Sequence, residues 1–257
     1  MKLALNTYNL LGDKTWEEII DICHSCGAAG IEFSIGYGHK HGVELDTPDE
    51  QLAKIREGIA AAGLEVVSIA SYCRFDRDSE EDFQRNLADA KRGIDLAARM
   101  GSPIFRFVAN DVPDFMPRPD FVLRISQVMR ELAEYGESKG VLSLLNMHGS
   151  FQHRCDVSRA ARLAAHPYAG LVYNCAPCDL VGGSVEVTVE RVLPYVRHVH
   201  LHELTDGYPY PEMFRLLKAA GYKGWFSVAV DDTSAEVQRF LGYYCALVRA
   251  WWEAAGR

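Results

Sequence analysis

Eight short apolar segments recur along the chain, and a segment with helical periodicity follows nearly every one of them. The apolar segments are KLALN (2–6), GIEFS (30–34), EVVSIA (65–70), IFRFV (104–108), VLSLLNMH (141–148), GLVYN (170–174), VRHVHLH (196–202) and WFSVAVD (225–231). Strands that alternate with helices are typical of an α/β protein with a parallel sheet. The repetition therefore predicts a (β/α)8 TIM barrel, in which the functional groups gather at the C-terminal ends of the strands.

The length of the chain agrees with one such barrel. It has 257 residues, and a barrel of this type typically has roughly 250. No segment rich in proline, glycine and serine interrupts the alternation of strands and helices, and no low-complexity segment is present. We therefore expect a single domain over residues 1–257.

Composition and charge exclude several kinds of partner. The net charge of −8 gives the surface no general attraction for nucleic acids or anionic membranes. No apolar stretch is long enough to span a bilayer, and the N-terminal segment turns polar at Asn6, unlike a signal peptide. The seven cysteines form no compact framework, which indicates reduced thiols in a cytoplasmic protein.

Helix boundaries can be predicted from capping residues, prolines and glycines. Helices are expected at 15–26, 47–62, 79–100, 119–139, 156–165, 184–193, 211–220 and from 234 to the end. Thr15 with Glu18 is predicted to form a capping box at the first helix, and Thr47 is predicted to cap the second. The segment 184–193 is rich in β-branched residues and gives the weakest helical signal.

Alternation along the predicted strands separates two sets of side chains. The apolar set is expected to pack outward against the helices, and the small or polar set is expected to face the mouth of the barrel. The polar set consists of Glu32, Arg106, Asn146, His148, Asn174, His200, His202 and Asp231. Burying so many polar and ionisable groups without a use is costly, so we expect them to form a site.

Several stretches resemble the xylose isomerase-like barrel superfamily, which includes sugar and sugar-phosphate isomerases and epimerases. They are GAAGIEFSIG (27–36), GLEVVSIASYCRF (63–75), DAKRGIDLAARMGSPIFRF (89–107), VLSLLNMHGS (141–150), VRHVHLHE (196–203) and GYKGWFSVAV (221–230). The resemblance implies an isomerase or epimerase of carbohydrate metabolism that acts on a small polyhydroxy compound. The superfamily is chemically broad, so the resemblance implies the fold more strongly than the reaction.

The resemblance also implies a metal site, from which this sequence departs. Enzymes of the superfamily typically hold manganese or magnesium with a Glu, an Asp, a His and a Glu on strands five to eight, and the two Glu residues move a proton through an enediolate. The corresponding positions here are Asn146, Asn174, His200 and Ala229. Only His200 matches, so we expect this chain to lack the usual metal-dependent two-Glu mechanism, with either no cofactor or a weakly bound divalent cation (manganese, magnesium or zinc).

Two uses of the remaining polar residues stay open. His148, His200 and His202 could form a metal site of their own, with Asp231 as a substitute carboxylate. Without a metal, the same histidines could act as acid and base near neutral pH. The candidate catalytic residues are His148, His200, Glu32 and Asp231, and the candidate substrate-binding residues are Arg106, Asn146, Asn174, His202 and Tyr72.

The polar environment of Arg106 has two interpretations, and the loops add further candidates. Arg106 could bind a phosphate or carboxylate of the substrate, or form an internal ion pair with Glu32. Tyr37, Tyr72 and Phe75 are expected to line the pocket from rim loops, whereas His39 and His41 are expected to be solvated. Cys23 and Cys26 are expected to be packed thiols on one helix face. A zinc or redox site at Cys175 and Cys178 is conceivable but lacks a second pair of ligands nearby.

Three functions compete at this stage. The preferred one is an isomerase, an epimerase or a related lyase, and the alternative is a non-catalytic carbohydrate-binding relative that has lost its metal site. An abasic-site DNA endonuclease shares the superfamily fold but fits least, since such enzymes need many zinc ligands and this chain is acidic. The aromatic-rich segment near the C-terminus suggests a possible homo-oligomer.

Overall fold

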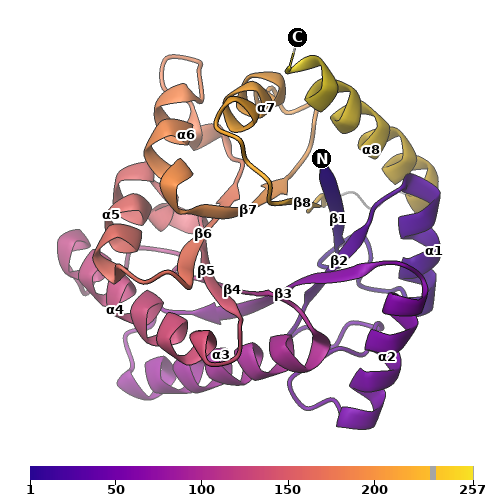
Figure 1. Ribbon diagram of the computed structural model, residues 1–257. Coiled ribbons are helices and arrows are strands. Elements are labelled where there is room, and N and C mark those ends of the chain that lie inside the picture. Colours follow the sequence, from indigo (N-terminus) through magenta and orange to yellow (C-terminus); the bar gives the residue numbers. More distant parts are fainter. Residues whose placement is uncertain (232–235, 257) are drawn as a thin grey trace.

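Eight parallel strands close into a barrel in the computed structural model, which describes residues 1–231 and 236–256 (Figure 1). Each strand pairs with its neighbours in sequence, and the last strand pairs with the first. The strands are β1 (Lys2–Asn6), β2 (Gly30–Ser34), β3 (Glu65–Arg74), β4 (Ile104–Val108), β5 (Leu142–Asn146), β6 (Ala169–Asn174), β7 (Val196–Leu201) and β8 (Trp225–Val228). The predicted (β/α)8 barrel is confirmed.

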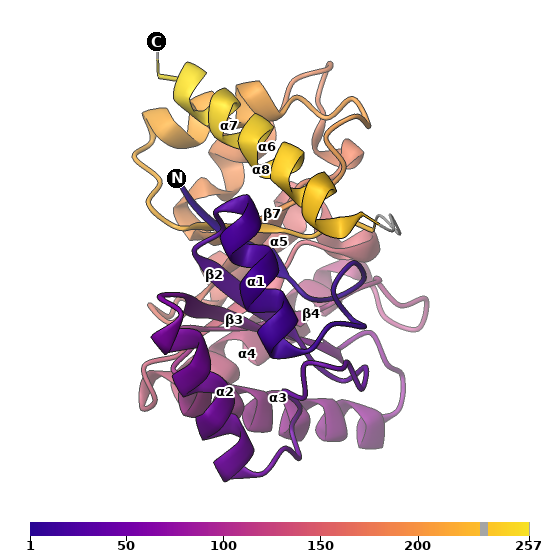
Figure 2. The same cartoon turned by 90° about the vertical axis from the view of Figure 1, so that its right-hand side faces the viewer.

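The helices form a ring around the strands (Figures 1 and 2). They are α1 (Trp16–Cys26), α2 (Asp49–Ala61), α3 (Glu80–Met100), α4 (Arg118–Glu137), α5 (Arg154–Ala164), α6 (Glu186–Val192), α7 (Tyr210–Ala219) and α8 (Val237–Ala254). Short 3-10 turns lie at η1 (Gly149–Gln152), η2 (Pro177–Asp179) and η3 (Leu193–Tyr195). The weakly predicted segment 184–193 is therefore helical over its centre.

The start of α1 agrees with its capping signal, but the start of α2 does not. Thr15 and Glu18 form the predicted capping box. Pro48, not Thr47, occupies the cap position of α2 and makes no side-chain cap bond. The Thr47 hydroxyl is already committed within the preceding loop, where it accepts from the Glu44 backbone N–H and donates to a carbonyl. The predicted start of the last helix at residue 234 lies outside the described residues.

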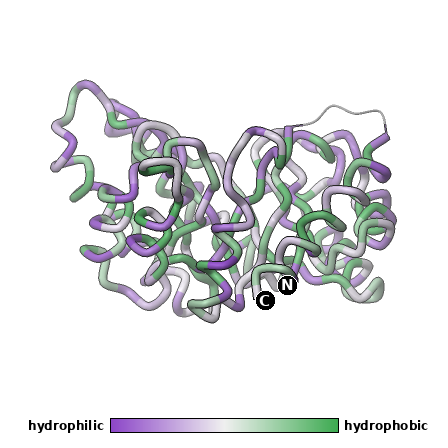
Figure 3. Tube along the Cα trace, turned by 90° about the horizontal axis from the view of Figure 1, so that it is seen from above, coloured by the Kyte–Doolittle hydropathy of each residue, from purple (hydrophilic) through white to green (hydrophobic). Residues whose placement is uncertain are grey.

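The two faces of each strand separate as the alternation predicts. Outward side chains such as Leu5, Phe33 and Phe107 join the main hydrophobic core against the helices. Inside the barrel, two small clusters fill the end where the strands begin, and they consist of Ala4, Val67 and Trp225 and of Ile104, Leu144 and Val172. Figure 3 places both chain termini at one end of the molecule. Because β1 starts there, the polar mouth lies at the other end.

Five strands differ in length from their predicted ranges, β6 and β7 by one residue and β3, β5 and β8 by more, which changes where the polar residues stand. β3 extends four residues further than predicted, to Arg74, whereas β5 ends at Asn146 and β8 ends at Val228. His148 and Asp231 therefore lie in the loops that follow their strands. No described helix has the length and hydropathy needed to cross a lipid bilayer.

Candidate active site

A cavity of about 160 Å³ opens where the C-terminal ends of the strands converge. Its walls are formed by Asn6, Tyr8, Tyr37, Tyr72, Arg106, Asn146, His148, Asn174, His200, His202, Ala229, Val230 and Asp231. Two of the sequence-predicted site residues, Glu32 and Phe75, do not belong to this set. Glu32 lies beneath the cavity, and both side chains are fully buried.

Glu32 accepts hydrogen bonds from two histidines of β7. His198 Nε2 lies 2.9 Å from one carboxylate oxygen, and His200 Nε2 lies 3.0 Å from the other. Burial opposes ionisation of Glu32, but His200 and His198 together hold its pKa well below its usual value. Burial also lowers the pKa of His200. At neutral pH the ionised Glu32 carboxylate therefore accepts a hydrogen bond from an uncharged His200 imidazole.

Asn174 connects His200 to His202. The terminal amide atom of Asn174 lies 3.2 Å from His200 Nδ1 and 2.8 Å from His202 Nε2. His202 Nδ1 donates to the Ala229 carbonyl over 2.7 Å, and burial lowers the pKa of His202. An uncharged His202 then presents a bare Nε2 to Asn174. The Asn174 amide satisfies both rings when its NH2 group faces them, because amide oxygen and nitrogen positions interchange by rotation.

His148 lies in the loop after β5, which is two strands away from β7 in the barrel. Its Nδ1 lies 2.9 Å from Asn110 Oδ1. The ring lines the cavity, and its Nε2 has no hydrogen-bond partner among the described residues. Burial, together with the charge of Arg106, lowers the pKa of His148. The ring is therefore uncharged at neutral pH and offers a lone pair to anything bound in the cavity.

Two further groups reach the cavity with unused hydrogen-bonding capacity. Arg106 donates from Nη1 to the Ser71 carbonyl over 2.9 Å, and its Nε has no partner. Arg106 forms no ion pair with any described residue, so the suggested pair with Glu32 is not formed. Glu32 is already occupied by the two histidines. Asn146 is 4% exposed, and its Oδ1 has no partner.

The rim of the cavity is aromatic and is held by one carboxylate. The ring centroid of Tyr37 lies 4.8 Å from that of Tyr8 and 6.2 Å from that of Tyr72. The loop that carries Tyr37 is fastened by Glu44, which accepts from three consecutive backbone N–H groups at residues 36–38. Sequence reasoning missed Tyr8, which follows β1 in a loop, where strand alternation gives no signal.

Two rim predictions are wrong. Phe75 is fully buried and packs against Phe83 and Phe107, because β3 continues beyond its predicted end and carries the ring into the core beneath α3. His41 is 1% exposed rather than solvated. Its Nε2 donates to the Ser34 carbonyl, its Nδ1 accepts from a backbone N–H, and burial lowers its pKa to about 4.

Three of the four thiols in the two cysteine pairs are buried, and the predicted packing of Cys23 and Cys26 is confirmed. Cys23 and Cys26 are buried on the inner face of α1, and Cys175 is buried against the sulfur of Met213. Cys178 is exposed. Neither pair forms a cluster of metal-ligating groups in the described part of the chain.

The donor set at the family's metal positions does not fit a divalent cation. His200 already engages Glu32 and Asn174 through its two ring nitrogens. Two amides and a methyl group supply no charge at the other positions, and hard cations prefer carboxylates. Within the described residues, the group Glu32, His198 and His200 alone gathers three candidate ligand atoms within 4.8 Å of one another. His148 and His202 do not join His200 in such a group.

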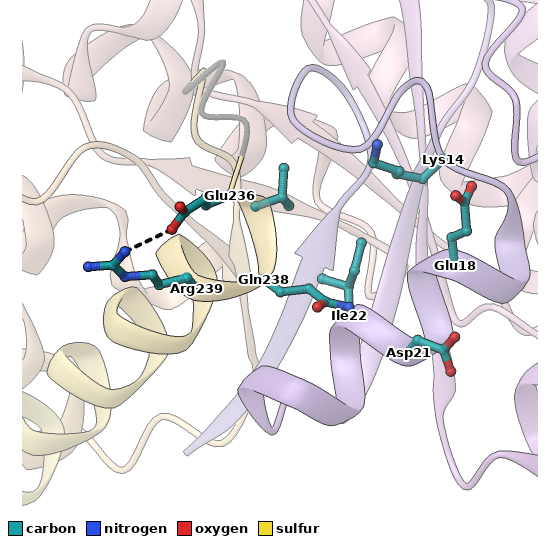
Figure 4. A pocket seen from close by; sticks show the side chains of 8 residues that line it. Lys14, Glu18, Asp21, Ile22, Glu236, Gln238 and Arg239 are labelled. Carbon is teal, nitrogen blue, oxygen red and sulfur yellow. Dashed lines mark hydrogen bonds and ion pairs between the residues drawn. The ribbon is translucent and has the colours of Figure 1, made fainter.

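A second hollow, of about 450 Å³, lies on the surface between α1 and α8 (Figure 4). Its labelled side chains are Lys14, Glu18, Asp21, Ile22, Glu236, Gln238 and Arg239, and Glu236 pairs with Arg239. These charged groups come from two helix starts and do not converge on a common point in Figure 4. The cavity at the barrel mouth, with its buried histidines, is therefore the candidate active site.

Comparison with known proteins agrees with the observed barrel. A family model described as "Xylose isomerase-like TIM barrel" matches residues 20–243, which is most of the chain. The chain belongs to this family. No curated protein matches its sequence. Family membership is consistent with the closed eight-stranded barrel and with the position of the polar cavity.

Solved structures share the fold at low sequence identity. L-ribulose 3-epimerase is 16% identical with a TM-score of 0.84, and the match covers 100% of this chain and 96% of the other. The apo form of 3-keto-D-glucoside 4-epimerase from E. coli is 14% identical with a TM-score of 0.79, covering 97% and 99%. A probable 3-DHS dehydratase from Bacillus anthracis is 14% identical with a TM-score of 0.76, also covering 97% and 99%.

Proposed function

We propose that this chain is a sugar or sugar-phosphate isomerase or epimerase-like enzyme that acts on a small polyhydroxy carbonyl compound in the cavity at the barrel mouth. Amides, imidazoles and phenols line the cavity, and these groups suit hydroxyl-rich ligands. Membership of the xylose isomerase-like family and the epimerases among the structural neighbours support this class of reaction.

The observation that carries the proposal is the Nε2 of His148, which has no hydrogen-bond partner among the described residues, in a ring that lines the cavity. An uncharged imidazole with its lone pair toward a ligand is a general base suited to neutral pH. His148 takes a proton from the carbon next to the substrate carbonyl, and the electron pair of that C–H bond forms an enediolate. The Arg106 guanidinium and the Asn146 amide N–H groups stabilise the developing negative charge.

Return of the proton needs a second group, for which Asp231 is the candidate, because Glu32 and Asn174 occupy both ring nitrogens of His200. Asp231 lies in the loop after β8, which is three strands from β5, and therefore approaches the cavity from another direction. Glu32 does not line the cavity, so we assign it to holding His200 in place. Asn174, His202 and Tyr72 bind substrate hydroxyl groups and the sugar face.

This mechanism does without the family's metal-dependent pair of Glu residues. Support comes from the poor donor set at Asn146, Asn174, His200 and Ala229 and from the hydrogen bonds that occupy His200. No step described here passes through a metal. The seven cysteines are free thiols, which supports a reducing, cytoplasmic location as part of the same proposal.

Arg106 favours a substrate with an anionic group. Its charge is uncompensated by any carboxylate among the described residues, and its guanidinium reaches the cavity. Guanidinium groups recognise carboxylates and phosphates through paired hydrogen bonds. A keto sugar acid and a ketose phosphate both meet this requirement.

Solvent deuterium exchange tests the reaction without knowledge of the product. The protein is incubated in D2O with a panel of ketoses, ketose phosphates and keto sugar acids, and NMR follows loss of the proton next to the carbonyl. We expect exchange with an anionic member, abolished in His148→Gln and His200→Ala variants that retain their circular dichroism. Arg106→Gln should raise the half-saturating concentration for anionic members only.

The non-catalytic alternative gives a different result in the same experiment. A ligand that binds by calorimetry but exchanges no proton would identify a carbohydrate-binding relative. Full exchange activity in His148→Gln would refute the assignment of the base.

A further inference from the structure

The loop after β4 determines which ring nitrogen of His148 carries the proton. Asn110 Nδ2 lies 3.1 Å from Asp76 Oδ2 and 2.8 Å from Asp111 Oδ2. Ionised carboxylates only accept hydrogen bonds, so the NH2 group of Asn110 has to face them. The opposite amide orientation would direct an oxygen at two carboxylates. Asn110 Oδ1 must therefore face His148, and an acceptor at that position requires a proton on Nδ1.

Asp76 is itself fixed from its other side. Arg74 contacts both of its oxygens, with Nε 3.1 Å from Oδ1 and Nη2 2.5 Å from Oδ2. The Asp76 side chain is only 7% exposed. Burial opposes its ionisation, but the hydrogen bonds from Arg74 and Asn110 lower its pKa below its usual value. The carboxylate is therefore ionised and immobile.

The backbone of Asn110 has a conformation that is energetically unfavourable for most residues. Its φ is 68°, a left-handed conformation that is uncommon for residues other than glycine. Such conformations concentrate at functional sites and persist where surrounding contacts impose them. The contacts here are the two carboxylates and His148.

We propose that Arg74, Asp76 and Asn110 are positioning residues that lock His148 into its Nδ1–H tautomer and so present a bare Nε2 to the substrate. The proposal rests on the proposed function, in which His148 is the base. In this arrangement the hydrogen bond at one ring nitrogen decides which protonation form the other shows to the cavity. Arg74 and Asp76 act only through Asn110, because neither lines the cavity.

The tautomer can be observed without a substrate. Long-range proton–nitrogen correlation NMR of protein labelled with 15N-histidine at pH 8 distinguishes a protonated ring nitrogen from a bare one, and loss of one signal set in His148→Gln assigns the ring. We expect the Nδ1–H form in the native protein. Asn110→Gly removes the acceptor and tolerates the positive φ, so the Nε2–H form should become a major species.

A matched variant separates the hydrogen bond from general disturbance of the loop. Ser150→Ala removes a contact between the same two loops, where Ser150 accepts from the Val112 backbone N–H, and should leave the tautomer unchanged. With a substrate from the exchange panel, Asn110→Gly should lower the maximal rate about tenfold with little change in the half-saturating concentration.

Two results would overturn the inference, and neither depends on activity. One is an Nε2–H form of His148 in the native protein, and the other is an unchanged tautomer in Asn110→Gly. Failure of the proposed function has a separate signature, because either the native protein would exchange no proton with any member of the panel or His148→Gln would retain full exchange, whatever tautomer the native ring adopts.

Discussion

His200 Nε2 donates to Glu32 Oε1 over 3.0 Å, and so links β7 to β2, two strands that do not pair in the barrel. The bond crosses the barrel interior beneath the cavity. It sets the height and direction of the His200 ring, because a fully buried carboxylate with no other charged partner has to be satisfied by the imidazoles around it.

Replacing Glu32 by Gln should therefore weaken the fold. The new amide NH2 would face an imidazole N–H, so one ring would lose its acceptor inside the barrel. We expect a loss of about 3 kcal/mol in the free energy of unfolding, as measured by urea denaturation at pH 7.5. The matched control is Glu65→Gln, at an exposed site on β3. A loss below about 1 kcal/mol would contradict the role given to this carboxylate.

Acid should destabilise the protein through protonation of the buried His41. His41 has a folded pKa lowered by burial to about 4, whereas an unfolded histidine titrates near 6.5. A depressed histidine pKa means that the unfolded state binds more protons, so stability is complete above pH 6.5 and falls as the pH drops toward 4. Linkage gives a contribution of about 2 kcal/mol lost between pH 7.5 and pH 5.

The measurement for His41 is the unfolding free energy at those two pH values in native protein, His41→Gln and Lys40→Gln. His41→Gln should be less stable at pH 7.5 but should lose about 2 kcal/mol less than the native protein on acidification. Lys40→Gln, an exposed change in the same loop, should keep the native pH dependence. Equal losses in all three proteins would argue against a buried, uncharged His41.

Removal of the Glu44 carboxylate should release the loop that carries Tyr37. Three backbone N–H groups at residues 36–38 would lose their acceptor. In Glu44→Ala, amide hydrogen exchange at these positions should accelerate at least tenfold, while exchange in the barrel strands stays near native values. Glu50→Ala, at an exposed site on α2, is the control. Unaltered protection of the loop would show that other contacts hold it.

Restoring the family's acidic residues should create a cation site. The variant Asn146→Glu/Asn174→Asp/Ala229→Glu joins three carboxylates to His200. We expect calorimetry to detect manganese binding at micromolar concentration in the variant and none at that level in the native protein. Tight binding by the native protein would refute the metal-free proposal, whereas absence of binding in a correctly folded variant would show that the Glu32 contact withholds His200.

The sequence is sufficient to predict the barrel and most of the cavity, because apolar alternation determines which face of a strand is buried. The sequence does not determine how far along the barrel axis each inward side chain lies. Glu32 and Arg106 both point inward, yet they lie at different levels and find different partners. Strand length is equally hidden, and this is why the position of Phe75 was wrong.

The positions of loop residues cannot be predicted from the alternation of side chains along strands. Asn110 and Tyr8 lie beyond the ends of their strands, where no alternation applies, and their contacts come from segments far away in sequence. Thr47 is a similar case, because its hydroxyl forms hydrogen bonds within its own loop instead of capping α2. In each case a tertiary hydrogen bond or ring contact, rather than a local preference, decides the outcome.

Hydrophobic side chains close the base of the barrel, so a ligand enters and leaves the cavity at the mouth. Ala4, Val67 and Trp225 close the far end, with Ile104, Leu144 and Val172 beside them, so arrival and departure share the aromatic rim. The product of any reaction here would leave by the path through which the substrate enters. The rates of substrate entry and product release would then depend on the loop that Glu44 holds.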